Sequence, residues 1–205
     1  KDISDVPDVD RVGEFADTIL QTGTYGNNEI EYIKFDKKNW ENDPLSKLVF
    51  LQTRVDTLID ASVKKIREIV DNAIGDLDKT GISLMVVVLK DRLVKINGKV
   101  EKRDLCIGGN HTFEAIKSSK HCNHMPILYI TEAEHKHFSA TEIDVASLSL
   151  NPRELQPKTS SSFDDIAKQV YKIRVKNPGI QDNRHSEIRK LYKRFHLTAS
   201  EIKVV

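Results

Sequence analysis

Two consecutive glycines, Gly108 and Gly109, separate an apolar, strand-like stretch from a helix-like one in the segment LCIGGNHTFEAI. Glycine tolerates positive φ angles and lets the backbone approach a ligand closely, so this junction constrains the fold. A helix that begins at residues 110–112 directs its free N–H groups and the positive end of its dipole into one small volume. The pattern predicts either a phosphate-sized anion site or a strand-to-helix turn that uses glycine for geometry alone.

The side chains after the two glycines suit the same site. Asn110 and Thr112 can cap the helix or donate to an anion, and His111 adds a titratable donor. His111 could also serve as a general base or metal ligand in phosphodiester cleavage, with Glu114 one turn along the same helix face. A metal-dependent DNA endonuclease that uses His111 and Glu114 is therefore one alternative function.

Hydrophobic periodicity predicts an α+β chain with a small mixed sheet and flanking helices, followed by a helical C-terminal region. The predicted strands cover residues 29–35, 82–89, 92–96, 100–107 and 126–130, with Asn97-Gly98 as a type I′ hairpin turn. The predicted helices cover residues 10–22, 58–74, 112–118, 132–150, 163–175, 185–195 and 199–205. The last two form a helix-turn-helix pattern.

Composition narrows the class of protein. Hydrophobic residues make up 39% and charged residues 31% of the 205 residues, and no run approaches the roughly 20 apolar residues of a membrane span. The acidic opening KDISDVPDVD does not resemble a secretory signal, so we expect a cytoplasmic protein. Cys106 and Cys122 lie in unlike contexts, and we expect both to be reduced.

Charge is distributed unevenly along the chain, although the net charge is only +1. Residues 1–50 carry five more acidic than basic side chains, whereas residues 166–205 carry seven more basic than acidic ones. We therefore expect the basic end of the chain to contact DNA. Its lysines and arginines would bind phosphates, and the second helix of the helix-turn-helix would contact the duplex as a recognition helix. The candidate DNA-binding residues are Arg184, Arg189, Lys190, Lys193, Arg194, Ser200 and Lys203.

A second histidine-rich segment, SKHCNHMP, has two readings. His121, Cys122 and His124 could approximate a zinc set together with His111. Structural zinc sites usually show two paired clusters with regular spacing, and this chain has one. We interpret these residues as part of a connecting loop and predict no metal ligands.

The order of these landmarks resembles the ParB-like and sulfiredoxin-like fold, in the family that includes "ParB-like nucleases". The stretch GGNHTFEAIKSSKHCNHMPILYI is similar to the family's strand, Gly-x-His/Arg-Arg turn, helix and Pro-apolar strand. Gln52-Thr53-Arg54 resembles an early Gln-x-Arg, and LSLNPRELQPKTSSSFDDIAKQV resembles a later Glu-Asn-x-x-Arg stretch. IRKLYKRFHLTASEIKVV resembles the start of the family's helix-turn-helix, so the likeness spans about residues 48–205.

The resemblance implies a DNA-binding protein of chromosomes, plasmids or phages. It also implies a phosphate or nucleotide site made from Gly108, Gly109, Asn110, His111, Thr112, Asn151 and Arg153. The cofactor is left open, with Mg²⁺ and a nucleoside triphosphate as the two candidates. A nucleotide-gated DNA clamp is a second alternative function. This chain has His111-Thr112 where CTP-dependent ParB proteins have paired arginines, and it lacks the glutamate of their later motif, which weakens the case for nucleoside triphosphate binding. It has Asn110 where sulfiredoxins have a reactive cysteine.

This reading divides the chain into three parts. Residues 1–45 are an N-terminal extension of unknown role, residues 46–131 are the ParB/sulfiredoxin-like domain, and residues 132–205 are the basic helical region. Symmetric DNA-binding proteins are frequently dimers, so a homodimer is one candidate assembly, and the sequence leaves the oligomeric state open. DNA is the expected partner, with nucleotide as a further one and with no membrane.

Overall fold

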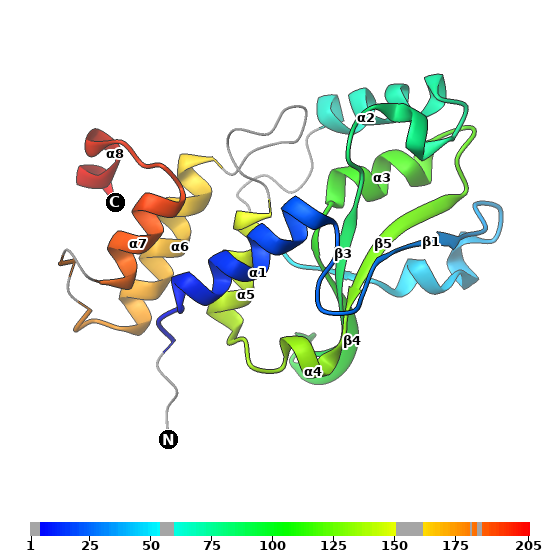
Figure 1. Ribbon diagram of the computed structural model, residues 1–205. Helices are drawn as coiled ribbons and strands as arrows, with labels where there is room; N and C mark the ends of the chain where they lie inside the picture. The colour runs from blue at the N-terminus through cyan, green and yellow to red at the C-terminus, as the bar shows by residue number, and fades with distance from the viewer. Residues whose placement is uncertain (1–4, 54–59, 151–161, 181, 184–185) are drawn as a thin grey trace. The chain divides into compact units, whose positions relative to one another are not determined.

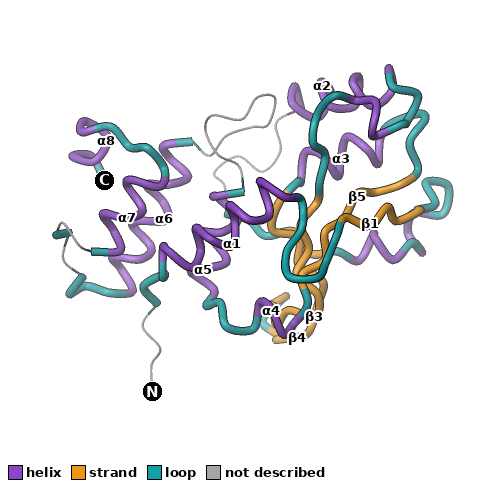
Figure 2. The backbone as a smooth tube through the Cα atoms, viewed as in Figure 1, coloured by secondary structure: helices purple, strands orange, loops and turns teal. Residues whose placement is uncertain are grey.

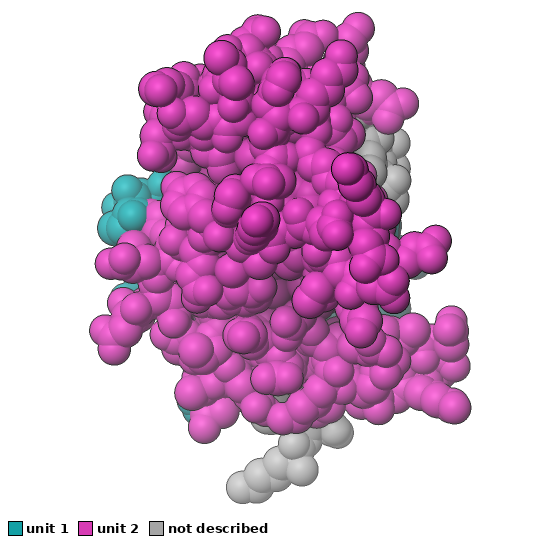
Figure 3. Space-filling view, turned by 90° about the vertical axis from the view of Figure 1, so that its right-hand side faces the viewer, with its two compact units in different colours: residues 1–22, 52–55, 137–205 teal, residues 23–51, 56–136 magenta. Residues whose placement is uncertain are grey.

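The computed structural model describes residues 5–53, 60–150, 162–180, 182–183 and 186–205, and it confirms the α+β class (Figure 1). The described residues contain a five-stranded mixed sheet and eight α-helices. The chain folds into two compact units, coloured separately in Figure 3. We call residues 1–22, 52–55 and 137–205 the helical unit, and residues 23–51 and 56–136 the sheet unit.

These units group the chain differently from the three-part division that the sequence suggested. The first helix, α1 (Val9–Thr22), belongs to the helical unit together with the C-terminal helices. The strand that follows it, β1 (Ile30–Lys34), belongs to the sheet unit. Residues 1–45 therefore contribute to both units.

The sheet unit is built on the strand order β1-β5-β3-β4-β2. Its strands are β1, β2 (Val49–Phe50), β3 (Val86–Ile96), β4 (Lys99–Gly108) and β5 (His124–Ile130). β3 pairs antiparallel with β4 and parallel with β5, β1 pairs antiparallel with β5, and β2 pairs parallel with β4. The parallel β3–β5 pair requires a crossover connection, and α3 (Asn110–Ser118) lies on it.

The helix α3 lies against the sheet, and a second helix packs on α3. This helix contacts both β3 and β5, and α2 (Asp60–Asn72) packs against it, as Figure 2 shows. A short helix, α4 (Glu132–His135), follows β5 and contacts β3. Three 3-10 helices, Trp40–Asn42, Pro44–Lys47 and Leu77–Thr80, complete the unit. Trp40 packs its ring against Phe35 and Phe113, so it covers part of the core.

The core of the sheet unit is centred on the first half of β3. Val86, Val87, Val88 and Leu89 are between 0% and 2% exposed, so this part of the strand is buried on both faces. The residues that surround this strand come from α2, α3, β4 and β5. They include Ile66, Val70, Cys106, Phe113, Ala115, Ile116, Met125 and Ile127.

Two expected strands are in fact one. The segments predicted at residues 82–89 and 92–96 form a single strand, β3, which is interrupted by a β-bulge between Leu89 and Arg92. The turn that follows was predicted correctly: Asn97 and Gly98 both have positive φ angles, +49° and +82°, as a type I′ turn requires.

The helical unit consists of α1 and four C-terminal helices. These are α5 (Ala140–Ser149), α6 (Phe163–Lys176), α7 (Glu187–Arg194) and α8 (Ala199–Val204). α1 packs against α5 and α7, and α5 packs against α6. The apolar positions that predicted α1, among them Val12, Phe15 and Ile19, are the ones it buries.

The single helix expected over residues 132–150 is divided into α4 and α5. The reason is a second N-cap: Ser139 accepts a hydrogen bond from the backbone N–H of Glu142, and the Glu142 carboxylate accepts one from the backbone N–H of Ser139. This capping box begins a new helix at Ala140 and leaves residues 136–139 as a connection. None of the described helices combines the length and apolar character that a membrane span requires.

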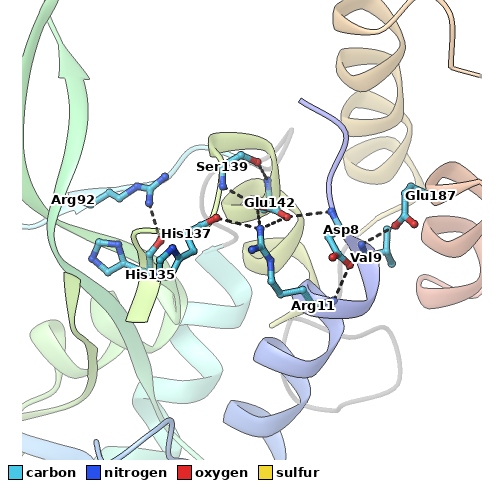
Figure 4. Close-up of polar contacts among 9 residues, drawn as sticks. All are labelled: Asp8, Val9, Arg11, Arg92, His135, His137, Ser139, Glu142 and Glu187. Atoms are coloured by element: carbon cyan, nitrogen blue, oxygen red, sulfur yellow. Dashed lines mark hydrogen bonds and ion pairs between the residues drawn. The ribbon is translucent and has the colours of Figure 1, made fainter. Parts of the chain in front are cut away.

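Glu142 also holds the start of α1 (Figure 4). Both of its carboxylate oxygens lie 2.6 Å from the Arg11 guanidinium, and one accepts a hydrogen bond from the backbone N–H of Asp8. The Glu187 carboxylate accepts a second hydrogen bond from this end of the helix, from the backbone N–H of Val9 at 2.8 Å. Two acidic side chains therefore satisfy N–H groups at the positive end of α1.

Candidate functional site

The glycine turn lies between β4 and α3, where the sequence placed it. β4 ends at Gly108, Gly109 is the N-cap with φ +85° and ψ 23°, and α3 begins at Asn110. A Cβ atom on Gly109 would lie 2.2 Å from the carbonyl oxygen of Met85 and 2.9 Å from the Cα of Val86. Glycine is thus required for both the left-handed conformation and the close packing of this turn against the residues that lead into β3.

The first turn of α3 presents backbone amides at this position. The carbonyl oxygen of Gly109 accepts the first intrahelical hydrogen bond, from Phe113 N at 2.8 Å, and no side chain caps the helix among the residues described. Backbone N–H groups in the first turn of a helix are directed toward its N-terminus, and in α3 that turn begins at Asn110. This geometry is what a phosphate group would require.

The side chains of the turn differ in their exposure. Asn110 and His111 are half-buried, whereas Thr112 is only 5% exposed and faces the protein interior. The Oδ1 atom of Asn110 accepts a hydrogen bond from the Sγ of Cys106 at 3.4 Å. The structure therefore brings Gly108, Gly109, Asn110 and His111 together, while the side chain of Thr112 does not extend toward solvent. The predicted contributors Asn151 and Arg153 lie outside the described residues.

Cys106 lies directly beneath this turn and is completely buried. Its thiol donates hydrogen bonds to the carbonyl oxygen of Gly108 at 3.3 Å and to Asn110. Burial raises the pKa of the Cys106 thiol to about 12, so the thiol remains protonated near neutral pH. Its role is to fill the space between the turn and the sheet.

The predicted catalytic residues, His111 and Glu114, lie on one face of α3, and Glu114 has an ion-pair partner. Glu114 and His111 are three residues apart on α3, and the Glu114 carboxylate lies 3.6 Å from the ammonium of Lys117.

His121 and His124 are exposed, while the thiol of Cys122 is buried and donates to the carbonyl oxygen of His124 at 3.3 Å. Across the described ranges, His, Cys, Asp and Glu side chains form no group of three or more that could hold a metal ion.

The predicted DNA-binding residues lie in the helical unit, and several have acidic partners there. Arg189 lies 3.0 Å from Asp182, and its guanidinium is 5.8 Å from the centre of the Tyr192 ring. Lys190 lies 2.6 Å from Asp10 and 2.7 Å from Glu187. Hydrogen bonds with these two carboxylates, first that of Asp10, raise the pKa of Lys190 above its usual value.

Arg194 is the most enclosed of the basic residues in this region. Its side chain is 16% exposed, and it donates to Asp17 at 3.0 Å and to the Ser149 hydroxyl at 2.9 Å. Its guanidinium lies over Gly13 of α1, where a Cβ atom would come within 2.9 Å of Nη1. Arg194 therefore connects α7 to α1 and α5, and its position identifies it as a structural residue.

Two lysines of the predicted set remain exposed. Lys193 on α7 and Lys203 on α8 both face solvent, and neither has an ion-pair partner in the part of the chain that the structure describes. The turn between their helices covers residues 195–198, with His196 at φ +52° and a capping box made by Thr198 and Glu201. The hydroxyl of Ser200 lies 3.1 Å from that of Thr198, and Arg184 is outside the described residues.

Sequence reasoning did not identify the acidic partners of these cations. Asp10 and Asp17 are seven residues apart on α1, and Asp10 lies beside Lys190 just as Asp17 lies beside Arg194. The available signal was the excess of acidic residues in the first part of the chain. That excess neutralises part of the basic region within the same unit, and it leaves Lys193 and Lys203 as the exposed cations of α7 and α8.

Comparisons of the chain with protein-family models, curated proteins and solved structures gave no match.

Proposed function

We propose that this protein binds duplex DNA in the manner of ParB-like proteins. The observation that carries the proposal is the pair α7 and α8, two helices joined by a four-residue turn, on which Lys193 and Lys203 are exposed. Helix-turn-helix proteins use such a pair to contact the duplex, and exposed lysines bind its phosphates. The ordered likeness of residues 48–205 to the ParB-like family supports the same function.

The glycine turn has a second role in this proposal. The amides at the start of α3 bind one phosphate group, which belongs either to a nucleotide or to the DNA backbone. Asn110 and His111 are the side chains placed to assist, because both are partly exposed beside those amides. Thr112 contributes its backbone N–H, since its side chain is buried.

The proposal is tested by measuring duplex binding of the full chain by fluorescence anisotropy at several salt concentrations. We expect affinity to fall steeply as salt rises, because phosphate contacts release counterions. The double variant Lys193→Ala/Lys203→Ala should reduce the salt dependence by about two phosphate contacts. Lys64→Ala/Lys65→Ala, two exposed lysines on α2, is the matched control and should bind as the parent does. A parent protein that binds no duplex at low salt would remove the proposal.

Two direct assays separate the alternatives. Cleavage of supercoiled plasmid in Mg²⁺ or Mn²⁺ that is lost in His111→Ala would identify a nuclease that uses this site. Titration with CTP, ATP and GTP, with and without DNA, would identify a nucleotide-gated clamp. If the phosphate site takes DNA alone, we expect neither cleavage nor nucleotide binding, and His111→Ala should weaken duplex affinity without abolishing it.

A further inference from the structure

The β3–β4 hairpin extends beyond the core of the sheet unit as a separate arm. Leu89 and Leu105 are paired and buried, but two residues, Lys90 and Asp91, then lie opposite the single residue Asp104. Asp91 has φ +52°, and its N–H donates to the Asp104 carboxylate at 3.1 Å. Such a bulge bends and twists a strand, and beyond it the burial pattern changes from continuous to alternating. We call residues 90–104 the β-arm.

The base of the β-arm is fixed to α4. The Arg92 guanidinium donates to the carbonyl oxygen of His135 at 3.0 Å, as Figure 4 shows, and the Nε2 of His135 lies 2.6 Å from the carbonyl oxygen of Lys90. Lys102 forms an ion pair with Glu132 at 2.9 Å. His135 itself is 1% exposed. These contacts hold the β-arm in one orientation, which lowers the entropic cost of binding a partner.

The two faces of the β-arm differ in character. Arg92, Val94 and Ile96 are half-buried on one face. The opposite face is formed by two cross-strand pairs, Leu93 with Lys102 and Lys95 with Val100, and all four residues are exposed. Leu93 is 62% and Val100 66% exposed, so this face presents two large aliphatic side chains to solvent.

Electrostatics identify the class of partner. The β-arm carries six basic and three acidic side chains, a net charge of +3. Lys95 and Lys99 are exposed and form no ion pair with any described residue. Interfaces between proteins are depleted of lysine, whereas phosphate backbones attract it. A surface of lysines alternating with aliphatic side chains therefore fits a nucleic acid better than a second protein.

We infer that the β-arm enters the major groove of duplex DNA with its exposed face toward the bases, so that Leu93 and Val100 lie against thymine methyl groups. Lys95 on that face and Lys99, which pairs with Ile96 on the other face beside the turn, bind phosphates at the edges of the groove. The major groove is about 12 Å wide and admits a two-stranded β-ribbon, and aliphatic side chains contact the thymine methyl there. This inference rests on the proposed DNA-binding function and adds a second DNA-contacting element, located in the sheet unit.

The electrostatic part is tested with the double variant Lys95→Ala/Lys99→Ala in the full chain. Its matched control is Lys34→Ala/Lys38→Ala, which removes two exposed lysines from another part of the same unit. In anisotropy titrations with a labelled duplex, the β-arm variant should reduce the slope of log affinity against log salt by about two, and the control should not change it. Thermal unfolding checks that both variants remain folded.

The outcomes separate this inference from the proposed function. If the parent binds DNA and the β-arm variant binds equally well, the inference fails and the proposed function stands. If the control loses as much affinity as the β-arm variant, the effect is one of overall charge and the inference also fails. If the parent binds no DNA, both fail. Binding of the parent to anionic vesicles but not to DNA, reduced in the β-arm variant, would assign the β-arm to a membrane surface and overturn the inference.

The apolar part is tested with Leu93→Ala/Val100→Ala and two duplexes that differ only in having thymine or uracil. Uracil lacks the methyl group that the aliphatic side chains would contact. The parent should bind the thymine duplex more tightly, and the variant should bind the two duplexes equally. A parent that does not distinguish them, or a variant that still does, would contradict the major-groove contact.

Discussion

Gly109 lies so close to Met85 that a Cβ atom on the glycine would be 2.2 Å from the methionine carbonyl oxygen. The contact joins the turn before α3, and with it the first residues of that helix, to the residue that precedes β3. The candidate phosphate site therefore depends on a backbone contact as well as on its own side chains.

Replacing Gly109 with alanine should destabilise the protein by about 2 kcal/mol or more, because a left-handed conformation and a backbone clash are both imposed. Gly81→Ala is the matched control, since Gly81 has φ +71° but no atom within 4 Å of its Cβ position. Urea unfolding of both variants should show the larger loss in Gly109→Ala, and equal losses would mean that the contact with Met85 contributes nothing.

Acid should weaken the attachment of α1 through Glu142. Burial acts to raise the pKa of Glu142, but hydrogen bonds from Arg11, Ser139 and Asp8 outweigh it and leave the pKa below its usual value of 4.5. A lowered pKa in the folded state means that the ionised carboxylate stabilises the fold. The stabilisation is complete above the usual pKa and is lost as the pH falls through the lowered one.

Glu142→Gln should therefore be less stable than the parent at pH 7, by about 2–3 kcal/mol, since it leaves the Arg11 charge without its partner. The difference between the two proteins should narrow as the pH is lowered below 4.5, the usual value for this carboxyl group. Urea unfolding at a series of pH values measures it. A difference that does not change with pH would show that the charge of Glu142 is unimportant.

Arg194→Ala should lower stability more than it lowers DNA affinity. It removes hydrogen bonds to Asp17 and Ser149 from a side chain that is 16% exposed. We expect a loss of about 1–2 kcal/mol, reduced from the value for a buried pair because Asp17 is half exposed. Lys193→Ala, one residue earlier and exposed, should stay within about 0.5 kcal/mol of the parent. Loss of DNA binding in Arg194→Ala with stability retained would reverse these assignments.

Both cysteines should resist alkylation in the folded protein. Cys106 is 0% and Cys122 2% exposed, and burial raises the pKa of the Cys106 thiol to about 12. A maleimide reagent near neutral pH should label neither thiol until urea unfolds the chain. Mass spectrometry of the parent and of Cys122→Ser would assign any reaction, and rapid native labelling of Cys106 would show that the space beneath the glycine turn opens readily.

The sequence predicted those parts of the fold that depend on local patterns. The periodicity of α1, the buried first half of β3, the turn at Asn97-Gly98 and the strand-to-helix change at Gly109 were all readable, because each follows from backbone geometry or from the side chains of a few neighbouring residues. The division of residues 132–150 was missed, although Ser139 and Glu142 have the spacing of a capping box. The apolar residues on both sides of Ser139 concealed it.

Features that depend on distant residues could not be predicted in this way. The pairing of Lys190 with Asp10 and of Arg194 with Asp17 joins positions 180 and 177 residues apart, and no local pattern indicates such contacts. For the same reason the sequence did not indicate that Arg189, Lys190 and Arg194 of α7 have acidic partners. The exposed face of the β-arm was also missed. It begins at the bulge at Asp91, where burial ends, and the sequence did not predict that bulge.

The attachment of α1 has a consequence for how the polypeptide acquires its structure during synthesis. The backbone amide of Val9 is bound by Glu187, which lies 178 positions farther along the chain. Closing so long a loop has an entropic cost and is slow compared with local pairing. During synthesis on the ribosome, the apolar side of α1 therefore remains uncovered until its partner helices have emerged. The sheet unit, whose strands end at Ile130, can fold before those helices are made.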